Sequence, residues 1–304
     1  MFVGIDVGGT KTHLLAAAGD DTVLDLVVPT AQWRHEGLHN DADVERLLEL
    51  FRNLPGGSES ALVVGAHGLD TDAQVLDFEL RLRRSHSGPV RALNDVELLG
   101  PATGYADAIA VVAGTGSKVV ARTANGASLT AGGYGYLFSD PGSAPGLARE
   151  AVRAVLDAQD SGQEPDALAE GLMAHFAVPD VDSLAHTFAA HARIQVWAPA
   201  APVIFAAADE GSHLAAAVID VAAADLAHGV DQVCSRGAVG THVVCAGGVI
   251  SNQSRLYDAF ARHVSALGRP LSVHLLTVPP VQGALALSRQ LIDTNMHQEN
   301  RRSS

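Results

Sequence analysis

Cysteine is nearly absent from this chain of 304 residues, which contains only Cys234 and Cys245. Two cysteines are too few for a disulfide framework or a cysteine-based zinc site, and we interpret them as buried thiols in a reducing compartment. The sequence also lacks the charged start of a signal peptide, so we expect none. It has no run of about 18 uncharged apolar residues, so we expect no membrane span. A cytoplasmic location follows from these expectations.

Positive charge is also scarce. Lysine and arginine together number 20 against 34 aspartates and glutamates, which gives a net charge of −14 at pH 7. Non-specific nucleic-acid binding needs a cationic face, so the composition argues against nucleic-acid partners and against an anionic membrane surface. The chain has two lysines, Lys11 and Lys118, and both lie in glycine-rich turns.

The length and a hydrophobic content of 47% predict a globular protein of two domains. Apolar periodicity predicts an α/β protein with a weak internal repeat, in which each half opens with three successive strands. The expected strands are 2–7, 12–18, 23–28, 61–65 and 90–93 in the first half, and 108–113, 118–122, 128–131, 243–245 and 271–275 in the second. Helices are expected at 41–51, 72–82 and 96–102, at 146–158, 165–175, 181–192, 199–210 and 212–234, and at 252–266 and 281–293. The polar tail 297–304 is expected to fray.

Two turns of similar composition, about a hundred residues apart, carry most of the functional information. One contains Gly8, Gly9 and Thr10, and the other contains Gly114, Thr115 and Gly116; each lies between two strands. Glycine allows the backbone to approach a ligand closely, and the N–H groups of such a turn can cradle phosphate. The pair predicts two half-domains that close on one polyphosphate.

Two aspartates stand at strand ends. Asp6 precedes the first glycine turn, where its carboxylate could hold Mg²⁺ beside the phosphates or could simply cap the turn. Asp95 follows the strand 90–93, so it could accept a proton from a hydroxyl that attacks phosphorus. The alternative for Asp95 is an N-cap on the helix that follows.

Other loops offer weaker signals. The segment 132–143, with Gly133 and Asp140, is a glycine-rich loop leading into a helix, and it is either a ligand loop or a left-handed turn with an N-cap. Gly247 and Gly248 follow a strand and permit a flat group to lie on the backbone. Trp33 could stack on a sugar or fasten its loop to the domain. His67 could serve the site or be a packed or hydrogen-bonded histidine.

The order of these elements resembles the actin, heat-shock chaperone and sugar kinase superfamily. Within it, the sequence looks most like the BadF/BadG/BcrA/BcrD-type ATPase family, which includes N-acetylglucosamine kinase. The segments that carry the resemblance are 4–12, 94–98, 113–117, 132–143 and 246–249.

The resemblance implies a two-lobed, actin-like ATPase (ribonuclease H-like) fold with duplicated β-β-β-α-β-α-β-α units and a helical insertion in the second lobe. The N-terminal lobe would comprise 1–97 plus 282–296, and the C-terminal lobe 98–281, followed by the tail 297–304. A homodimer is also expected from the family.

The resemblance further implies an ATP-dependent sugar kinase that acts on N-acetylglucosamine or glucosamine, with ATP and Mg²⁺ as cofactors and Asp95 as general base. Its expected metal ligand is Asp6. The expected ATP-binding residues are Gly8, Gly9, Thr10, Lys11, Gly114, Thr115, Gly116, Gly247 and Gly248. The expected sugar-binding residues are Asn94, Asp140, Trp33, Gly133 and His67.

The sequence departs from the family pattern in the presumed sugar pocket. Pro141 replaces the glutamate of a Gly-Asp-Glu-Gly-Ser segment, and Ala31-Gln32-Trp33 stands where the kinases carry an asparagine. The alternative function is therefore an ATPase or a nucleotide or sugar sensor without sugar turnover. The cysteines lack the spacing of the iron–sulfur activators in this family, and no Cys-rich zinc loop is present.

Overall fold

The chain folds into two compact units. Unit 1 comprises Met1–Ala108 together with Leu276–Ser304, and unit 2 comprises Ile109–Leu275. The structure, a computed structural model, describes the backbone of residues 1–105 and 107–302 and the side chains of these ranges through residue 292. The lobe boundaries expected from the sequence, at 97 and 282, both fall inside unit 1.

Unit 1 is built on a five-stranded mixed sheet in the order β3-β2-β1-β4-β5. Strand β1 pairs with β2 in antiparallel fashion and with β4 in parallel, and β4 is parallel to β5. The strands are β1 (Phe2–Val7), β2 (Lys11–Ala18), β3 (Asp21–Pro29), β4 (Ala61–Ala66) and β5 (Val90–Asn94). All five lie within two residues of their predicted bounds.

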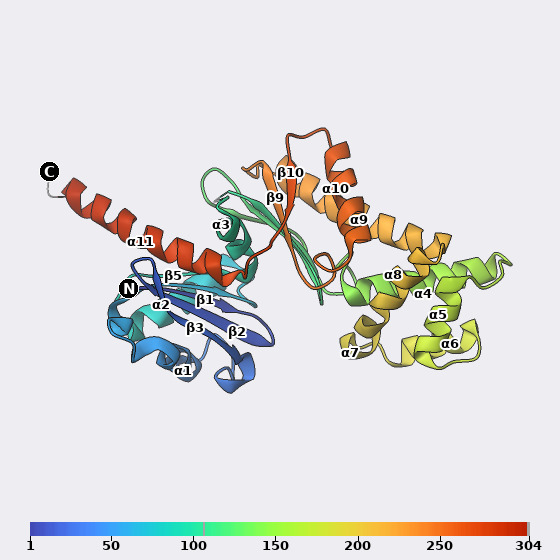
Figure 1. Cartoon of the computed structure of the whole chain (residues 1–304), viewed down its shortest axis with the longest axis horizontal. Coiled ribbons are helices and arrows are strands. Elements are labelled where there is room, and N and C mark those ends of the chain that lie inside the picture. Colours follow the sequence, from blue (N-terminus) through green and yellow to red (C-terminus); the bar gives the residue numbers. More distant parts are fainter. Residues whose placement is uncertain (106, 303–304) are drawn as a thin grey trace. The chain divides into compact units, whose positions relative to one another are not determined.

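Helices cover both faces of this sheet (Figure 1). Apolar residues of α1 and α2 pack on Val3, Ile5 and Val7, while α11 packs on the opposite face. The helices of unit 1 are η1 (Thr30–Gln32), α1 (Asp41–Arg52), η2 (Gly57–Glu59), α2 (Asp72–Ser85), η3 (Asp95–Leu98), α3 (Leu99–Thr103) and α11 (Val281–Arg302). The tail expected to fray at 297–304 is helical through Arg302, and 303–304 lie outside the described residues.

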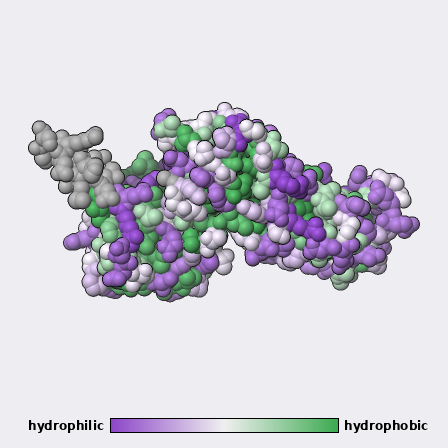
Figure 2. Space-filling model, turned by 45° about the horizontal axis from the view of Figure 1, so that its top comes forward, coloured by the Kyte–Doolittle hydropathy of each residue, from purple (hydrophilic) through white to green (hydrophobic). Residues whose placement is uncertain are grey.

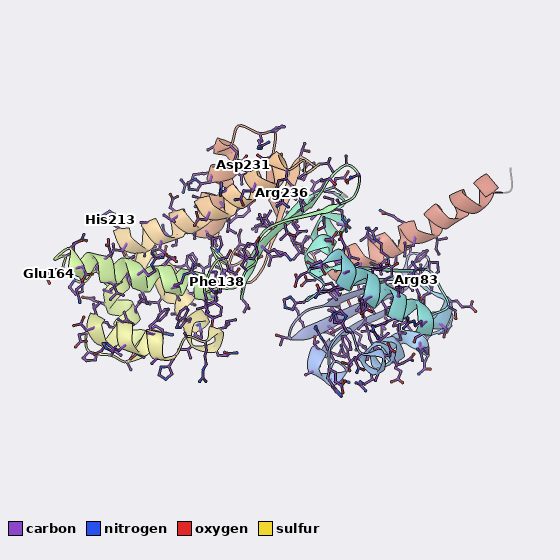
Figure 3. All side chains as sticks on the ribbon, turned by 180° about the vertical axis from the view of Figure 1, so that it is seen from behind. Arg83, Phe138, Glu164, His213, Asp231 and Arg236 are labelled. Atoms are coloured by element: carbon purple, nitrogen blue, oxygen red, sulfur yellow. The ribbon has the colours of Figure 1, made fainter. Side chains whose placement is uncertain are left out.

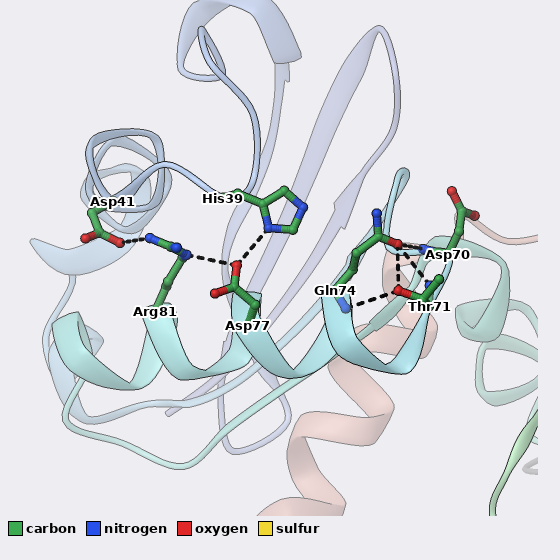
Figure 4. A network of polar contacts seen from close by, with 7 residues as sticks. All are labelled: His39, Asp41, Asp70, Thr71, Gln74, Asp77 and Arg81. Atoms are coloured by element: carbon green, nitrogen blue, oxygen red, sulfur yellow. Dashed lines mark hydrogen bonds and ion pairs between the residues drawn. The ribbon is translucent and has the colours of Figure 1, made fainter.

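The N-terminal half of α2 is fixed by side-chain hydrogen bonds (Figure 4). Thr71 and Gln74 form a capping box at its start, which satisfies backbone N–H groups that a helix leaves without partners. One turn before its end, Arg81 bridges Asp41 at the start of α1 and Asp77. These contacts fasten α2 to α1 on one face of the sheet.

Close packing of α11 on unit 1 depends on two glycines. A Cβ on Gly4 would lie 2.3 Å from the backbone nitrogen of Leu285, and one on Gly283 would lie 2.0 Å from the carbonyl oxygen of Leu98. Neither position can therefore carry a larger residue while α11 stays in place. Because η3 and α3 also pack against α11, residues 98–108 belong to unit 1.

Unit 2 repeats the topology of unit 1. Its sheet has the order β10-β9-β6-β7-β8, with the same sequence of antiparallel and parallel pairs. The strands are β6 (Ile109–Ala113), β7 (Ser117–Arg122), β8 (Ser128–Gly132), β9 (His242–Ala246) and β10 (Ser272–Leu275). The predicted α/β fold and its internal repeat are confirmed.

The helical block of unit 2 lies between β8 and β9 and shares one apolar core with that sheet. The helices of unit 2 are α4 (Ala144–Asp160), α5 (Ala167–Phe176), α6 (Val181–Ala190), α7 (Ile194–Trp197), η4 (Ala198–Ala200), α8 (Ala201–Asp209), α9 (His213–Ser235) and α10 (Ser254–Ala266). The prediction missed the short α7, which positions Trp197 to stack on Phe188 at 4.0 Å between ring centroids. Both cysteines are free; Cys245 is buried as expected, and Cys234 is half-buried.

Helix α9 is, among the described residues, the one helix long and apolar enough to cross a membrane by length and composition. Half of its most apolar stretch is buried in unit 2, where it packs against α4, α8, α10 and the sheet, which is also how the core helix of a globular unit behaves. Hydrophilic residues cover much of the face of the molecule seen in Figure 2. An exposed apolar side chain, Phe138, lies on the loop before α4 (Figure 3).

Candidate active site

The predicted residues of unit 1 gather at one edge of its sheet. Strands β1, β4 and β5 run parallel, so their carboxyl ends meet at the same edge, where ligands bind in open α/β sheets. Gly8 follows β1, His67 follows β4, and Asp95 follows Asn94 at the end of β5. The sequence could not show that these segments are adjacent, because the strand order is set by tertiary packing.

The first glycine turn is a tight hairpin. The backbone N–H of Gly8 donates to the carbonyl of Lys11 at 2.9 Å, and Thr30 Oγ1 donates to the carbonyl of Gly8 at 2.9 Å. Gly9, Thr10 and Lys11 are exposed. The turn is thus held from behind while its tip is open to a ligand.

Asp6 lies on the sheet face opposite Val3, Ile5 and Val7, because side chains alternate along a strand. Desolvation, together with the nearby carboxylate of Asp95, raises the pKa of Asp6 to about 7, although the ammonium of Lys11 acts in the opposite direction. The site therefore holds two carboxylates close enough to repel, with one ammonium beside them. The alternative that Asp6 only caps the turn gains no support, since within the described residues its carboxylate accepts no hydrogen bond from the turn.

The N-cap of η3 is Asn94 rather than Asp95. Asn94 Oδ1 accepts from the N–H of Val96 at 3.1 Å, and its amide nitrogen donates to the carbonyl of Leu69 at 3.0 Å. Asp95 Oδ1 shares the Val96 N–H at 3.0 Å, which leaves Oδ2 directed elsewhere. Asn94 is buried and occupied by these contacts, so it positions Asp95 and is a poor candidate for direct contact with a sugar.

His67 is exposed beside Asp95. Its Nδ1 lies 3.8 Å from Asp95 Oδ2, and its side chain is 66% exposed, so it is not a packed histidine. The backbone carbonyl of His67 accepts from Arg34 Nη1 at 3.3 Å. The analysis of the sequence did not select Arg34, whose proximity to His67 depends on the pairing of distant segments.

Trp33 does not offer its ring to a ligand. Its side chain is 2% exposed, and its indole Nε1 donates to Thr12 Oγ1 at 2.9 Å. Thr12 Oγ1 in turn lies 3.0 Å from Thr30 Oγ1. The expected sugar stacking is therefore wrong for this structure, and Trp33 fastens its loop to β2.

The arrangement in unit 1 suits Mg²⁺ held by few protein oxygens. No cluster of three or more acidic, histidine or cysteine side chains with metal-binding geometry occurs in the described part of the chain. Mg²⁺ commonly uses one or two carboxylates, retained waters and substrate phosphates. Asp6, with its raised pKa and its repulsion from Asp95, is the group that a bound cation would stabilise most.

In unit 2 the second glycine turn packs against the strand-to-helix turn after β9. The N–H groups of Val249 and Ile250 both donate to the carbonyl of Ala113 at 3.1 Å. Gly247 has φ +114°, and a Cβ there would lie 2.4 Å from that same oxygen, whereas one on Gly248 would meet nothing within 4 Å. The structure brings Gly114, Thr115, Gly116, Gly247 and Gly248 together, as two turns of one unit.

Asp140 braces the second turn from within unit 2. It is 5% exposed, takes the left-handed conformation (φ 62°), and accepts from the N–H of Gly135 at 3.2 Å. Burial raises its pKa, opposed by hydrogen bonds from backbone N–H groups of Gly135 and Ser117. Ser143 caps α4, so the left-handed turn with an N-cap is confirmed, and the carboxylate of Asp140 is not presented on the surface. Gly133 is exposed in the same loop, at φ 78°.

Ser117 is a second residue that the sequence did not single out for a role. Its hydroxyl is buried and, within the described residues, has no hydrogen-bond partner. Such groups are rare in folded proteins. The signal in the sequence that could have pointed to Ser117 is its place directly after Gly114, Thr115 and Gly116.

Two sheets of identical topology, each carrying a glycine turn after its first strand, define an actin-like ATPase fold. Comparison with known families agrees: residues 3–285 match the model of the BadF/BadG/BcrA/BcrD ATPase family. The chain belongs to this family.

The chain is similar to kinases across nearly its whole length. It is 24% identical over 303 residues to the N-acetylmuramic acid/N-acetylglucosamine kinase of Clostridium acetobutylicum, covering 96% of this chain and 99% of the relative. A solved structure named "Putative N-acetylglucosamine Kinase" from Chromobacterium violaceum has a TM-score of 0.66 at 21% identity, covering 94% of this chain and 98% of that one. A ROK family glucokinase from Streptomyces griseus, solved with glucose and AMPPNP, has a TM-score of 0.53 at 17% identity, covering 95% of this chain and 99% of that one.

Proposed function

We propose that this protein is an ATP-dependent kinase that transfers the γ-phosphoryl group to a hydroxyl of an amino sugar, such as N-acetylglucosamine or glucosamine. One observation carries the proposal: Asp95 stands at the carboxyl edge of β5 beside Asp6, while Asn94 takes over the helix-capping role. The names of the relatives support the substrate class.

In this proposal Asp95 takes the proton of the attacking hydroxyl, which needs a carboxylate within hydrogen-bond reach of the substrate. The N–H groups of the turn at Gly8, Gly9 and Thr10, with the ammonium of Lys11, hold the phosphates. Asp6 would hold Mg²⁺, which when bound supplies positive charge that neutralises the phosphoryl oxygens.

Unit 2 would bind the rest of the nucleotide. Gly114, Thr115 and Gly116 would contribute backbone N–H groups to the phosphates, and Gly247 with Gly248 would line the adenosine site. His67 and Gly133 would contact the sugar, and Asp140 would act through the loop that it braces. We also propose that the protein is a cytoplasmic homodimer, with the phosphate-1 and sugar side in unit 1 and the phosphate-2 and adenosine side in unit 2.

The test is release of ADP from Mg·ATP by the purified full chain against a panel of sugars. The panel contains glucosamine, N-acetylglucosamine, N-acetylmannosamine, glucose and a blank without sugar. The proposal predicts ADP release that depends on an amino sugar. Equal release with and without every sugar, from protein that binds ATP in a thermal-shift assay, would favour an ATPase or a sensor.

A further inference from the structure

His67 stands on a turn whose backbone is fixed by contacts with other segments of unit 1. The backbone N–H of His67 donates to the carbonyl of Val7, at the end of β1, at 2.8 Å. Its carbonyl accepts from Arg34 Nη1 at 3.3 Å, and two residues further on the carbonyl of Leu69 accepts from the amide of Asn94 at 3.0 Å. The turn is therefore preorganised before a ligand binds, which is what a group that stabilises a transition state requires.

The ring of His67 lies between the proposed base and the first glycine turn. Its Nδ1 is 3.8 Å from Asp95 Oδ2. The other side of the ring faces the turn, since a Cβ on Gly9 would lie 3.9 Å from His67 Cδ2, the carbon bonded to Nε2. Asp95 Oδ1 accepts from the N–H of Val96 at 3.0 Å, so the oxygen that faces the histidine is Oδ2. The imidazole thus joins the two parts of the site between which a phosphoryl group would move.

The charged side chains in this part of unit 1 come from several elements: Asp6 from β1, Lys11 from β2, Arg34 from the loop before α1 and Asp95 from η3. The two carboxylates act on each other, since Asp95 helps to raise the pKa of Asp6. A polyphosphate on the glycine turn adds more negative charge. With Asp95 at Nδ1 and a phosphoryl oxygen at Nε2, the ring of His67 meets an anionic acceptor at each nitrogen, and it then donates from both as an imidazolium.

We propose that His67 is a catalytic residue that donates from Nε2 to an oxygen of the phosphoryl group during transfer, while its Nδ1 donates to Asp95 Oδ2. The inference rests on the proposed function and goes beyond the sugar contact given to His67 there. In the step, the sugar oxygen bonds to the γ-phosphorus, the bond from that phosphorus to the bridging oxygen of ADP breaks, and the hydroxyl proton passes to Asp95. His67 keeps its protons throughout and stabilises the negative charge on the phosphoryl oxygens.

The experiment compares wild type, His67→Gln and His39→Gln with Mg·ATP and the sugar that gives the most ADP release. Glutamine keeps a polar side chain but cannot carry the charge. His67→Gln should lower kcat by about 100-fold, the effect of removing one donor to a developing oxyanion, and should change the KM for ATP and for the sugar by less than about threefold. His39→Gln is the matched control, because His39 also pairs with an aspartate, Asp77 on α2, at 2.7 Å (Figure 4). It should match the wild type.

Binding of a transition-state mimic separates this inference from the proposed kinase. ADP with aluminium fluoride copies the phosphoryl group in transit, whereas AMPPNP copies the ground state. In calorimetry with Mg²⁺, His67→Gln should weaken binding of the mimic by about 100-fold and that of AMPPNP by less than about threefold. This expectation holds even if no sugar is phosphorylated, a result that would defeat the proposed kinase alone.

Several results would overturn the role of His67 in phosphoryl transfer. One is an equal effect of His67→Gln on the mimic and on AMPPNP. Another is an unchanged kcat with a raised KM for the sugar, which would leave His67 as a sugar contact alone. The same losses in His39→Gln, or a wild type that binds the mimic no more tightly than AMPPNP, would also contradict it.

Discussion

Two carboxylates of unit 1 show how the surroundings of a residue set its charge. Burial alone would raise the pKa of Asp43, but backbone N–H groups of the loop 35–37 and the guanidinium of Arg46 lower it to about 2. Asp6 accepts no such hydrogen bonds from the residues that the structure describes. Burial and the nearby Asp95 outweigh the ammonium of Lys11, so the pKa of Asp6 rises to about 7. The charge of Asp43 therefore stabilises its own loop, whereas the charge of Asp6 would be stabilised by a bound cation.

Asp6→Asn is expected to stabilise the protein in the absence of Mg²⁺ and nucleotide. Because the pKa of Asp6 is about 7 in the folded state and 3.8 as the reference, the folded protein keeps a proton that the unfolded chain releases. The neutral carboxyl therefore stabilises the folded state fully below pH 4. This contribution to the free energy of unfolding is lost as the pH rises to 7, and the loss is at most roughly 4 kcal/mol.

The measurement is the Tm of wild type and Asp6→Asn in a chelator, from pH 4.5 to 8. The Tm advantage of the variant should grow through this range up to pH 7 and then level off. In a parallel scan with Mg·ATP in place of the chelator, the ligand should raise the Tm of the variant less than that of the wild type. A constant Tm difference at every pH would contradict the assignment.

Asp95→Asn should lower kcat by several orders of magnitude while leaving ATP affinity within about threefold, since the amide cannot accept the proton. The matched control is Asp72→Asn, at an exposed carboxylate in the first turn of α2, outside the proposed machinery. Initial rates and ATP titrations by thermal shift give both quantities. Turnover near the wild-type rate would remove Asp95 from the mechanism.

At the scale of elements, the turns after β6 and β9 depend on each other. Gly247→Ala is expected to destabilise unit 2 by several kcal/mol, because φ is +114° and the new Cβ would lie 2.4 Å from the Ala113 carbonyl oxygen. Gly248→Ala meets no atom within 4 Å, so it should keep the Tm of the wild type.

Both glycines line the proposed adenosine site, so both variants should bind ATP more weakly. Urea denaturation separates the two effects. Equal stability of the two variants would show that the close approach at Gly247 is not needed.

The elements were largely predictable, because most strands and helices here follow simple rules of periodicity and capping. The prediction failed where tertiary contacts decide. A single helix at 96–102 is expected from the sequence, yet the chain forms η3 and then α3. Asn94 caps η3, and α11 packs against both short helices. Trp33 in a polar loop gave no sign that Thr12, on another strand, would take its indole N–H.

At the scale of the whole molecule, the repeat was visible in the sequence as two Gly-Thr turns, each after a β-branched strand. The sequence did not show that the two units share the same strand order, because the neighbours and register of a strand are set by contacts between distant segments. The closeness of Asp6 and Asp95 in the candidate site was predictable, because each lies at or next to the end of a strand. The contact between Arg34 and His67 was not predictable, since it depends on the loop after β4 lying beside the loop that carries Arg34.

The most direct measurement of the central claim is the fate of the γ-phosphate. Full-length protein with γ-labelled ATP, Mg²⁺ and the preferred sugar from the panel would be followed by mass spectrometry. The account predicts labelled phosphosugar in equal amount to ADP, with none formed by Asp95→Asn. Labelled inorganic phosphate in place of phosphosugar would contradict it.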